Sequence, residues 1–281
     1  MILGMERSMT AAERTEIERL ARRVRGHCLR MTHRGRSGHV GSMLSIAEIM
    51  AVLYTRVLRV DPAHPRAPDR DRFILSKGHA GGAVYAVLGE LGFFPQEWFQ
   101  GYYRDGGRLM GHISHHVPGV EFSTGSLGHG LPVAVGMALA ARHARRQHRI
   151  ICLMSDGDCN EGSTWEALLF AAQHKLDNLT VIVDYNRIQA LGMSKDVLDL
   201  EPFATKLQAC HWAVKEVDGH DVAALDAALA VLPFETGKPS WLLARTVKGK
   251  GVSWMENTVA CHYGSVTDEE LARALAEIGA E

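Results

Sequence analysis

Two short apolar runs separated by a helical stretch constrain the fold of this chain more than any other feature. Residues Ile150–Met154 and Leu179–Val183 have the composition of buried strands, and Ser163–His174 between them has helical spacing of apolar residues. A strand, a helix and a strand in this order form a parallel pair with a right-handed crossover. We therefore predict an α/β protein with a mostly parallel sheet and helices on both faces.

Other segments extend this alternation of strands and helices. Apolar spacing predicts helices at about 10–31, 45–57, 132–144, 221–232 and 268–278, and short apolar runs predict strands at 73–75, 213–217 and 241–247. Ser45 and Glu48 have the spacing of a capping box, which places the start of the second helix at Ser45. Because no repeat or low-complexity linker divides the chain, we predict a single domain over residues 1–281.

The composition excludes several classes of protein. With 46% hydrophobic and 22% charged residues, the chain is typical of a globular protein. Its 31 basic and 32 acidic residues provide no net positive field to attract nucleic acid or an anionic membrane. Five cysteines without CxxC spacing indicate a reducing compartment. Since the first residues do not read as a signal peptide and no stretch of 18 apolar residues occurs, we expect a cytoplasmic protein that does not span a membrane.

Polar residues follow both strands of the central unit. Asp156 and Gly157 come directly after the first strand, and Asn186 follows the second. Ligands bind at the carboxyl ends of parallel strands, so these residues are expected to face one crevice. Carboxylate and amide oxygens suit Mg²⁺ or Ca²⁺, whereas glycine and the following helix N-terminus suit a phosphate. The sequence therefore predicts a site for a divalent cation and a diphosphate.

Three other interpretations compete for the same segment. An EF-hand loop beginning at Asp156 is disfavoured, because Glu161 stands where that loop needs glycine and Ala167 where it needs glutamate. A dinucleotide-binding site is disfavoured because no GxGxxG motif joins a strand to a helix. A capped strand-to-helix turn without a ligand stays open.

The segment also resembles the thiamine diphosphate motif of transketolases, GDG followed about 30 residues later by Asn. Ser155-Asp156-Gly157 corresponds to GDG with serine in the first place, and Asn186 lies 30 residues beyond Asp156. The resemblance implies that Asp156, Asn186 and the backbone carbonyl of Ile188 bind Mg²⁺, for which Ca²⁺ or Mn²⁺ could substitute. It also implies that Gly157, Asp158, Asn186 and Ile188 contact thiamine diphosphate, Gly157 through its N–H.

Further segments carry the same resemblance over residues 10–267. They are Ser37-Gly38-His39-Val40-Gly41, Leu75-Ser76-Lys77-Gly78-His79-Ala80, Gly111-His112, Pro118-Gly119-Val120-Glu121 and Ser123-Thr124-Gly125-Ser126-Leu127-Gly128-His129-Gly130. These ordered segments identify the chain as similar to the N-terminal, diphosphate-binding part of a transketolase. The implied fold is the thiamine-diphosphate-binding fold.

Histidines are abundant, with 15 in 281 residues. A single histidine is usually a satisfied core or surface residue, but His39, His79 and His112 each follow a glycine. Imidazole can take a proton from a substrate hydroxyl and return it near neutral pH. The resemblance implies that His39 and His112 contact substrate hydroxyl and carbonyl oxygens and that His79 lies on the diphosphate side of the same pocket.

The resemblance assigns roles to three further residues. Gly125 and Leu127 would frame the thiamine, and His262 would lie near the diphosphate and the donor hydroxyl. Transketolases usually have glycine directly after this last histidine, whereas Tyr263 intervenes here. Lys248 and Lys250 follow a predicted strand end, where they could meet a phosphate or be solvated loop residues.

Two glutamates follow the cofactor motif, and two interpretations of them stay open. Glu161 and Glu166 could place acidic charge in the first turns of a helix. In transketolases the corresponding positions resemble members of a carboxylate network that joins paired active sites, where shared protons raise one pKa and suit a proton relay.

The resemblance covers only the first of three transketolase domains. We therefore expect a partner chain that carries the pyrimidine-binding and C-terminal domains, in an α₂β₂ heterotetramer that binds sugar or sugar-phosphate substrates. The implied activity is transfer of a two-carbon ketol group from a ketose to an aldehyde. Alternatives are the α chain of a 2-oxo acid decarboxylase or dehydrogenase, a deoxyxylulose-phosphate-synthase-like protein, or a non-catalytic scaffold that keeps the fold.

Overall fold

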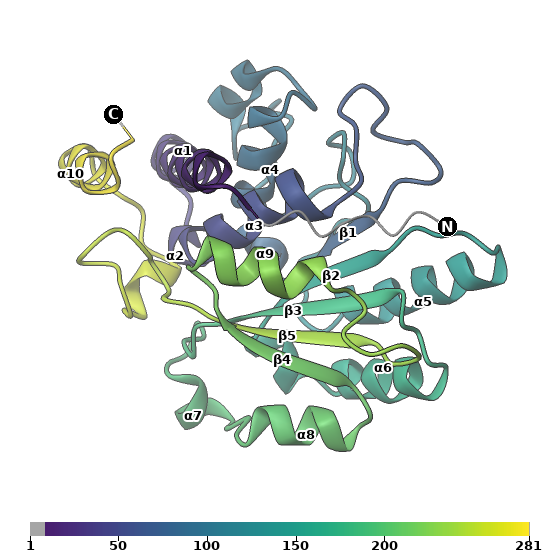
Figure 1. Cartoon of the computed structure of the whole chain (residues 1–281). Helices are drawn as coiled ribbons and strands as arrows, with labels where there is room; N and C mark the ends of the chain where they lie inside the picture. Colours follow the sequence, from purple (N-terminus) through teal and green to yellow (C-terminus); the bar gives the residue numbers. More distant parts are fainter. Residues whose placement is uncertain (1–8, 281) are drawn as a thin grey trace.

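A computed structural model describes residues 9–280, and a five-stranded sheet forms its centre (Figure 1). The strands are β1 (Arg72–Leu75), β2 (Ile150–Ser155), β3 (Leu179–Tyr185), β4 (Ala213–Asp218) and β5 (Ser240–Arg245). Their order is β1-β2-β3-β5-β4, and every neighbouring pair is parallel. The prediction of an α/β protein with a parallel sheet is confirmed.

Helices cover both faces of this sheet, with α1, α3, α4 and α9 on one side and α6 and α8 on the other (Figure 1). The α-helices are α1 (Ala11–Gly35), α2 (Val40–Leu44), α3 (Ala47–Val52), α4 (Gly81–Glu90), α5 (Gly130–His143), α6 (Gly162–Gln173), α7 (Ser194–Val197), α8 (Phe203–Ala209), α9 (Val222–Ala230) and α10 (Asp268–Ile278). A π-helix, η1 (Leu53–Val57), and four 3-10 helices, η2 (Gly78–Ala80), η3 (Gln96–Gly101), η4 (Gly157–Asn160) and η5 (Ala260–His262), complete the set. None of the helices between residues 9 and 280 is long and apolar enough to cross a membrane.

Side chains of the central strands alternate between two hydrophobic cores. In β2, Ile151 and Leu153 pack into the core that contains α1, α3 and α4, whereas Cys152 and Met154 pack into the core that contains α5 and α6. Successive residues of a strand point to opposite faces, and both faces are covered. This explains why the strand is a continuous apolar run in the sequence.

The second predicted helix differs from the structure. Residues 40–57 form three short pieces, α2, α3 and η1, and Ile46 rather than Ser45 precedes α3. The Ser45 hydroxyl bonds the carbonyl of Ser42 and lies 2.7 Å from the Asp184 carboxylate, while the Glu48 carboxylate bonds Arg25. The capping-box prediction is therefore wrong, because both side chains bond partners that are distant in the sequence.

The sequence pattern does not predict helix α4, because the helix contains three glycines and glycine disfavours helices. Close packing explains two of them. A Cβ at Gly81 would lie 2.7 Å from the backbone nitrogen of Ile113, and one at Gly82 would lie 2.6 Å from the sulfur of Met43. The neighbouring segments thus approach the helix backbone at positions where no side chain fits.

Candidate active site

A cavity of about 310 Å³ lies at the edge of the sheet where the parallel strands end. Strand register places its polar residues, since Ser155 pairs with Asp184, and Asp156 and Asn186 follow these two at neighbouring strand ends. The lining consists of His39, Ser42, Lys77, His79, His112, Gly125, Leu127, Ser155, Asp156, Gly157, Asn186, Ile188, Gln189, Ala190, Leu191, Lys248, His262 and Tyr263. All three predicted metal ligands are therefore in one cavity.

Asp156 is buried beside this cavity and forms no ion pair with any residue between 9 and 280. Its Oδ1 accepts a hydrogen bond from the Gly157 N–H (2.9 Å), and its Oδ2 accepts one from the Ser194 hydroxyl (2.6 Å). Burial raises the pKa of Asp156 and the nearby Asp184 carboxylate adds to the rise, whereas the Ser194 hydrogen bond and the Lys77 charge reduce it without cancelling it. A buried carboxylate with a raised pKa and no directly bonded cation fits a site for a bound metal ion.

The other two predicted ligands complete a set of oxygen atoms. The Asn186 Oδ1 accepts from the Ile188 N–H at 3.0 Å, and Ile188 lines the same cavity as Asp156. Carboxylate, amide and carbonyl oxygens match the preference of Mg²⁺. No cluster of three or more His, Cys, Asp or Glu side chains suited to a metal occurs among residues 9–280, so the described residues form no zinc-type site.

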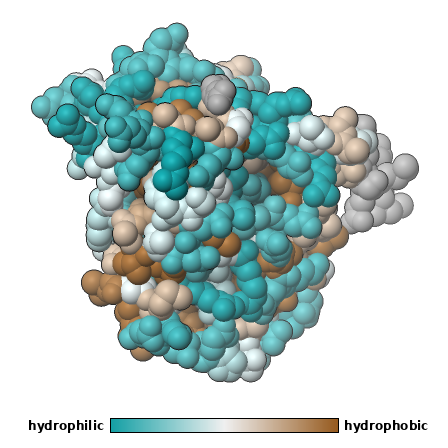
Figure 2. Space-filling model, turned by 90° about the vertical axis from the view of Figure 1, so that its left-hand side faces the viewer, coloured by the Kyte–Doolittle hydropathy of each residue, from teal (hydrophilic) through white to brown (hydrophobic). Residues whose placement is uncertain are grey.

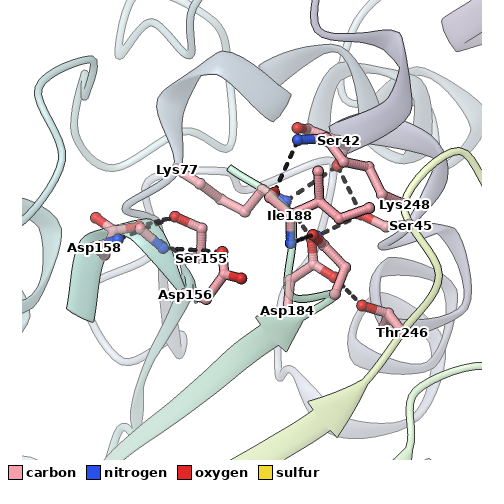
Figure 3. A network of polar contacts seen from close by, with 12 residues as sticks. Ser42, Ser45, Lys77, Ser155, Asp156, Asp158, Asp184, Ile188, Thr246 and Lys248 are labelled. Atoms are coloured by element: carbon pink, nitrogen blue, oxygen red, sulfur yellow. Dashed lines mark hydrogen bonds and ion pairs between the residues drawn. The ribbon is translucent and has the colours of Figure 1, made fainter. Parts of the chain in front are cut away.

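Asp184 anchors a buried polar network behind these ligands (Figure 3). Its carboxylate accepts hydrogen bonds from Lys77, Ser45, Thr246 and Asn186. Burial alone would raise the pKa of Asp184, but the Lys77 ammonium and the hydroxyl donors bring it below its usual value. The charged carboxylate therefore holds the Asn186 amide with its oxygen free to bond the Ile188 N–H.

A second buried lysine enters the cavity from the segment after β5. Lys248 is 1% exposed, and its Nζ donates to the Ile188 carbonyl (2.9 Å) and lies 2.8 Å from the His262 Nδ1. Burial, together with the Lys77 charge, lowers the pKa of Lys248 to about 8. The interpretation of Lys248 as a solvated loop residue is therefore wrong, whereas Lys250 is partly exposed and pairs with Glu256.

Four histidines are clustered on the same cavity. The ring of His39 lies 5.2 Å from that of His79, 5.6 Å from that of His112 and 5.0 Å from that of His262, measured between centroids. Burial is the main cause that lowers their pKa values, to about 4 for His39 and about 3 for His262. It also lowers the pKa values of His79 and His112. All four imidazoles are therefore neutral at physiological pH.

Glycines bring two of these histidines together. A Cβ at Gly38 would lie 3.0 Å from the Cα of Tyr263, and one at Gly41 would overlap Cys261. The N–H of His39, which has a positive φ of 70°, donates to the carbonyl of His262 at 2.6 Å. The turn before α2 thus packs directly against η5. Tyr263 does not displace His262, and its own ring is 68% exposed at the rim of the cavity.

The remaining predicted cofactor residues divide into two groups. Gly125, Leu127 and Gly157 line the cavity, and a Cβ at Gly125 would meet only the His112 ring at 3.7 Å, so the space beside it is open. Asp158 lies behind the cavity instead. Its carboxylate accepts from the Ser76 hydroxyl, the Gly128 N–H and both donors of Ser155. The structure thus makes Asp158 a positioning residue for the loops of the site.

Glu161 and Glu166 are not in the cavity lining. Glu161 precedes α6 and Glu166 lies within it, and both are exposed. The structure therefore separates these two carboxylates from the histidines and the metal-ligand set of this chain.

Sequence reasoning missed several residues of the cavity lining, among them Ser42, Lys77 and Gln189. Lys77 had a usable signal, because it lies two residues after a predicted strand end and precedes the Gly-His pair. Gln189 had only its proximity to Ile188, and its side chain bonds the Asn160 amide oxygen at 2.7 Å.

Comparison with known proteins gives a consistent family assignment. Residues 17–281 match the family described as "Transketolase, thiamine diphosphate binding domain". The chain is 41% identical over 266 residues to an apulose-4-phosphate transketolase subunit of Actinobacillus succinogenes, covering 94% of this chain and 96% of that protein. It is also 41% identical to the 6-deoxy-6-sulfo-D-fructose transketolase subunit SqwG of a Clostridium species, over 87% of this chain and 89% of that one.

Solved structures give the same result. Transketolase from Leishmania mexicana superposes with a TM-score of 0.89 at 32% identity, and transketolase from Campylobacter jejuni with a TM-score of 0.88 at 31% identity. Each match covers 94% of this chain but only 41% and 43% of the solved chains, respectively. The chain therefore spans about two fifths of the length of these transketolases.

Proposed function

This chain belongs to the transketolase family, and we propose that it is the thiamine diphosphate-binding subunit of a two-chain transketolase. The reaction would move a two-carbon ketol group from a ketose or ketose phosphate to an aldehyde. One observation carries the proposal: four neutral imidazoles adjoin a buried carboxylate with a raised pKa in one cavity.

The charged groups of the cavity support the cofactor assignment. The oxygens of Asp156, Asn186 and Ile188 would hold Mg²⁺, and the Gly157 N–H, His79 and Lys248 would contact the diphosphate. Two buried ammonium groups, those of Lys77 and Lys248, favour an anionic ligand here, because charge interactions are strong where water is excluded. Thiamine diphosphate, when bound, supplies an electron sink for cleavage of a carbon–carbon bond.

The histidines would handle the protons of the reaction. A neutral imidazole can accept a proton from a substrate hydroxyl at one nitrogen and donate to a carbonyl oxygen at the other, which suits His39 and His112. The Lys248 ammonium donates to the Nδ1 of His262, so the proton of this imidazole is on Nε2. The Nε2–H of His262 is therefore a donor for a substrate or diphosphate oxygen.

A partner chain is part of the proposal. It would carry the pyrimidine-binding and C-terminal domains and would form an α₂β₂ assembly with this chain; relatives that are themselves named transketolase subunits, and that match this chain over 96% and 89% of their length, support a separate partner. Hydrophobic groups lie among hydrophilic ones on the side of the molecule that carries α7 and α10 (Figure 2). After β3, Leu191 at the cavity rim is 86% exposed and Leu198 is 56% exposed. These side chains suit an intersubunit contact beside the active site.

The side chains available to bind a substrate phosphate also support a role for the partner chain. No arginine occurs among the described residues that line the cavity, and both lysines bond protein oxygens. A sugar phosphate would therefore take its phosphate contacts from the partner chain.

The test begins with a tagged pull-down from the native host in thiamine diphosphate and Mg²⁺. We expect a stoichiometric second chain that carries the pyrimidine-binding and C-terminal domains, and a complex that transfers a ketol group from a ketose donor to an aldehyde. The same complex is assayed with pyruvate. Recovery of this chain alone would contradict the two-chain proposal, turnover of pyruvate without ketol transfer would favour an oxo-acid enzyme, and cofactor binding without turnover would favour a scaffold.

A further inference from the structure

A buried charged cluster lies outside the cavity, where no proposed step uses it. Arg25 in α1 and Glu48 in α3 form a two-pronged ion pair with distances of 2.5 Å and 2.6 Å, and both residues are buried. Burial alone would raise the pKa of Glu48, but Arg25 and His220 lower it to about 2. The glutamate is therefore a carboxylate at neutral pH.

His220 connects this pair to the backbone after β5. Its Nδ1 lies 3.0 Å from the Glu48 Oε2, and its Nε2 lies 2.8 Å from the backbone nitrogen of Val247. A backbone N–H can only donate, so the Nε2 must be the accepting nitrogen. The Nδ1 then carries the proton and donates it to the carboxylate. The network thus selects one neutral tautomer of His220.

Val247 immediately precedes the buried lysine of the cavity. The loop that carries Lys248 is also held by the Gly249 N–H on the Gly41 carbonyl (3.0 Å) and by the Asn257 N–H on the Lys248 carbonyl (2.9 Å). His220 adds a side-chain acceptor for the Val247 N–H, next to Thr246, whose hydroxyl bonds Asp184. The lysine in turn reaches the Ile188 carbonyl and His262.

We infer that His220 is a positioning residue for the active site, which holds the Lys248 loop through its Nε2 while the Arg25–Glu48 pair fixes its tautomer. The inference rests on the proposed function, because the loop is expected to matter through contact of Lys248 with the cofactor diphosphate. His220 itself is outside the cavity lining.

Two substitutions separate the two hydrogen bonds of His220. In His220→Gln, the side-chain oxygen reaches the place of Nε2 and can still accept from the Val247 N–H. In His220→Asn, the amide nitrogen reaches the place of Nδ1 and keeps the bond to Glu48, but Val247 loses its acceptor. His64→Asn is the matched control, because the Nδ1 of that exposed histidine also bonds a carboxylate, Asp61 (2.9 Å).

Two measurements are made on the complex of this chain with its partner. Hydrogen–deuterium exchange of the peptide that contains Val247 is followed without cofactor, and the dissociation constant of thiamine diphosphate is measured by calorimetry at fixed Mg²⁺. We expect His220→Asn to speed exchange of the Val247 amide and to weaken cofactor binding about tenfold, as expected for an unpaired donor. His220→Gln should stay within about twofold of the parent, and His64→Asn should change neither quantity.

Equal losses in the two variants, or faster exchange without weaker binding in His220→Asn, would overturn the inference. The first result would mean that His220 only supports the fold, and the second that the loop does not act on the cofactor. If the unsubstituted complex bound no thiamine diphosphate, the proposed function would fail and this inference with it. Exchange would still report separately whether the His220 bond holds the loop.

Discussion

Two buried aspartates lie at opposite edges of the sheet, and they differ in whether arginine side chains neutralise the carboxylate. Asp71 precedes β1, and its carboxylate accepts hydrogen bonds from the side chains and backbone N–H groups of Arg59 and Arg149. Burial alone would raise the pKa of Asp71, but these donors lower it to about 2. Asp156 follows β2 and is equally buried, yet it forms no ion pair within the described part of the chain, and its pKa is raised although Lys77 lies near enough to oppose the rise.

The two carboxylates therefore have different roles. The protein itself neutralises the carboxylate at the amino-terminal edge of the sheet, so that carboxylate stabilises the fold. At the carboxyl-terminal edge the carboxylate adjoins a cavity and is only partly compensated by the nearby Lys77 charge, which costs free energy unless a further cation binds there. Substitutions at the two edges should therefore have opposite effects on stability and on cofactor binding.

The largest expected effect is that of Asp156→Asn on the cofactor. Loss of the charged ligand should weaken Mg²⁺-dependent thiamine diphosphate binding by about a thousandfold, or about 4 kcal/mol. Without cofactor, the free energy of unfolding should not fall, because an amide can replace the partly compensated carboxylate beside Ser194. Calorimetry and thermal unfolding of the assembled complex measure the two quantities, and unchanged binding would refute the metal assignment.

Asp71→Asn should reduce stability and leave cofactor binding unchanged. It leaves two arginines facing a neutral amide, and the free energy of unfolding should fall by about 3 kcal/mol, since removal of one member of a buried ion pair is strongly destabilising. Cofactor affinity in the folded complex should be unchanged. Asp69→Asn is the control, because its pair with Arg146 is exposed and should be worth less than about 0.5 kcal/mol. Equal losses from both substitutions, measured by chemical unfolding, would contradict the comparison.

Acid should destabilise the protein by protonating Asp71 at the amino-terminal edge of the sheet. The folded pKa of Asp71 is about 2, below its ordinary value of 3.8, so the carboxylate contributes stability above about pH 4 that is lost as the pH falls toward 2. The contribution of this one residue is about 2 kcal/mol. Unfolding measured from pH 6 to pH 2 should show a weaker pH dependence in Asp71→Asn than in the parent chain. Identical pH profiles would mean that other carboxylates dominate acid unfolding.

The smallest expected effect concerns the exposed carboxylate of Glu166. Glu166→Gln should change the free energy of unfolding by less than about 0.5 kcal/mol, because this side chain is exposed. A proton relay between paired sites would instead appear as reduced ketol transfer in the assembled complex with cofactor affinity unchanged. Steady-state kinetics of the complex distinguish a relay from an ordinary surface charge, and full activity would favour the latter.

Much of the site was predictable because its ligands follow strand ends. Asp156 and Asn186 come after apolar runs that are buried on both faces, and parallel strands bring such positions to one edge. His39, His79, His112 and His262 were found through their motifs, and the structure places all four in one cavity. Their roles in catalysis stay predictions until the assembled enzyme is assayed.

Other features depended on contacts between distant residues. Ser45 has the local pattern of a helix cap, but its hydroxyl bonds Asp184, which is 139 residues away. Glu48 has the pattern of a capping partner, but it bonds Arg25 and His220. In both cases a buried charged partner replaces the weaker local bond that the pattern indicates.

The amino-acid sequence alone determined the α/β class, the parallel strands and the residues that follow them, because these depend on hydrophobic periodicity and on local chain direction. Only the tertiary structure decided that Lys248 is buried, that Asp158 supports loops behind the cavity, and that Asp71 is neutralised while Asp156 is not. Burial and charge compensation are sums over neighbours from the whole chain, and no local pattern records them.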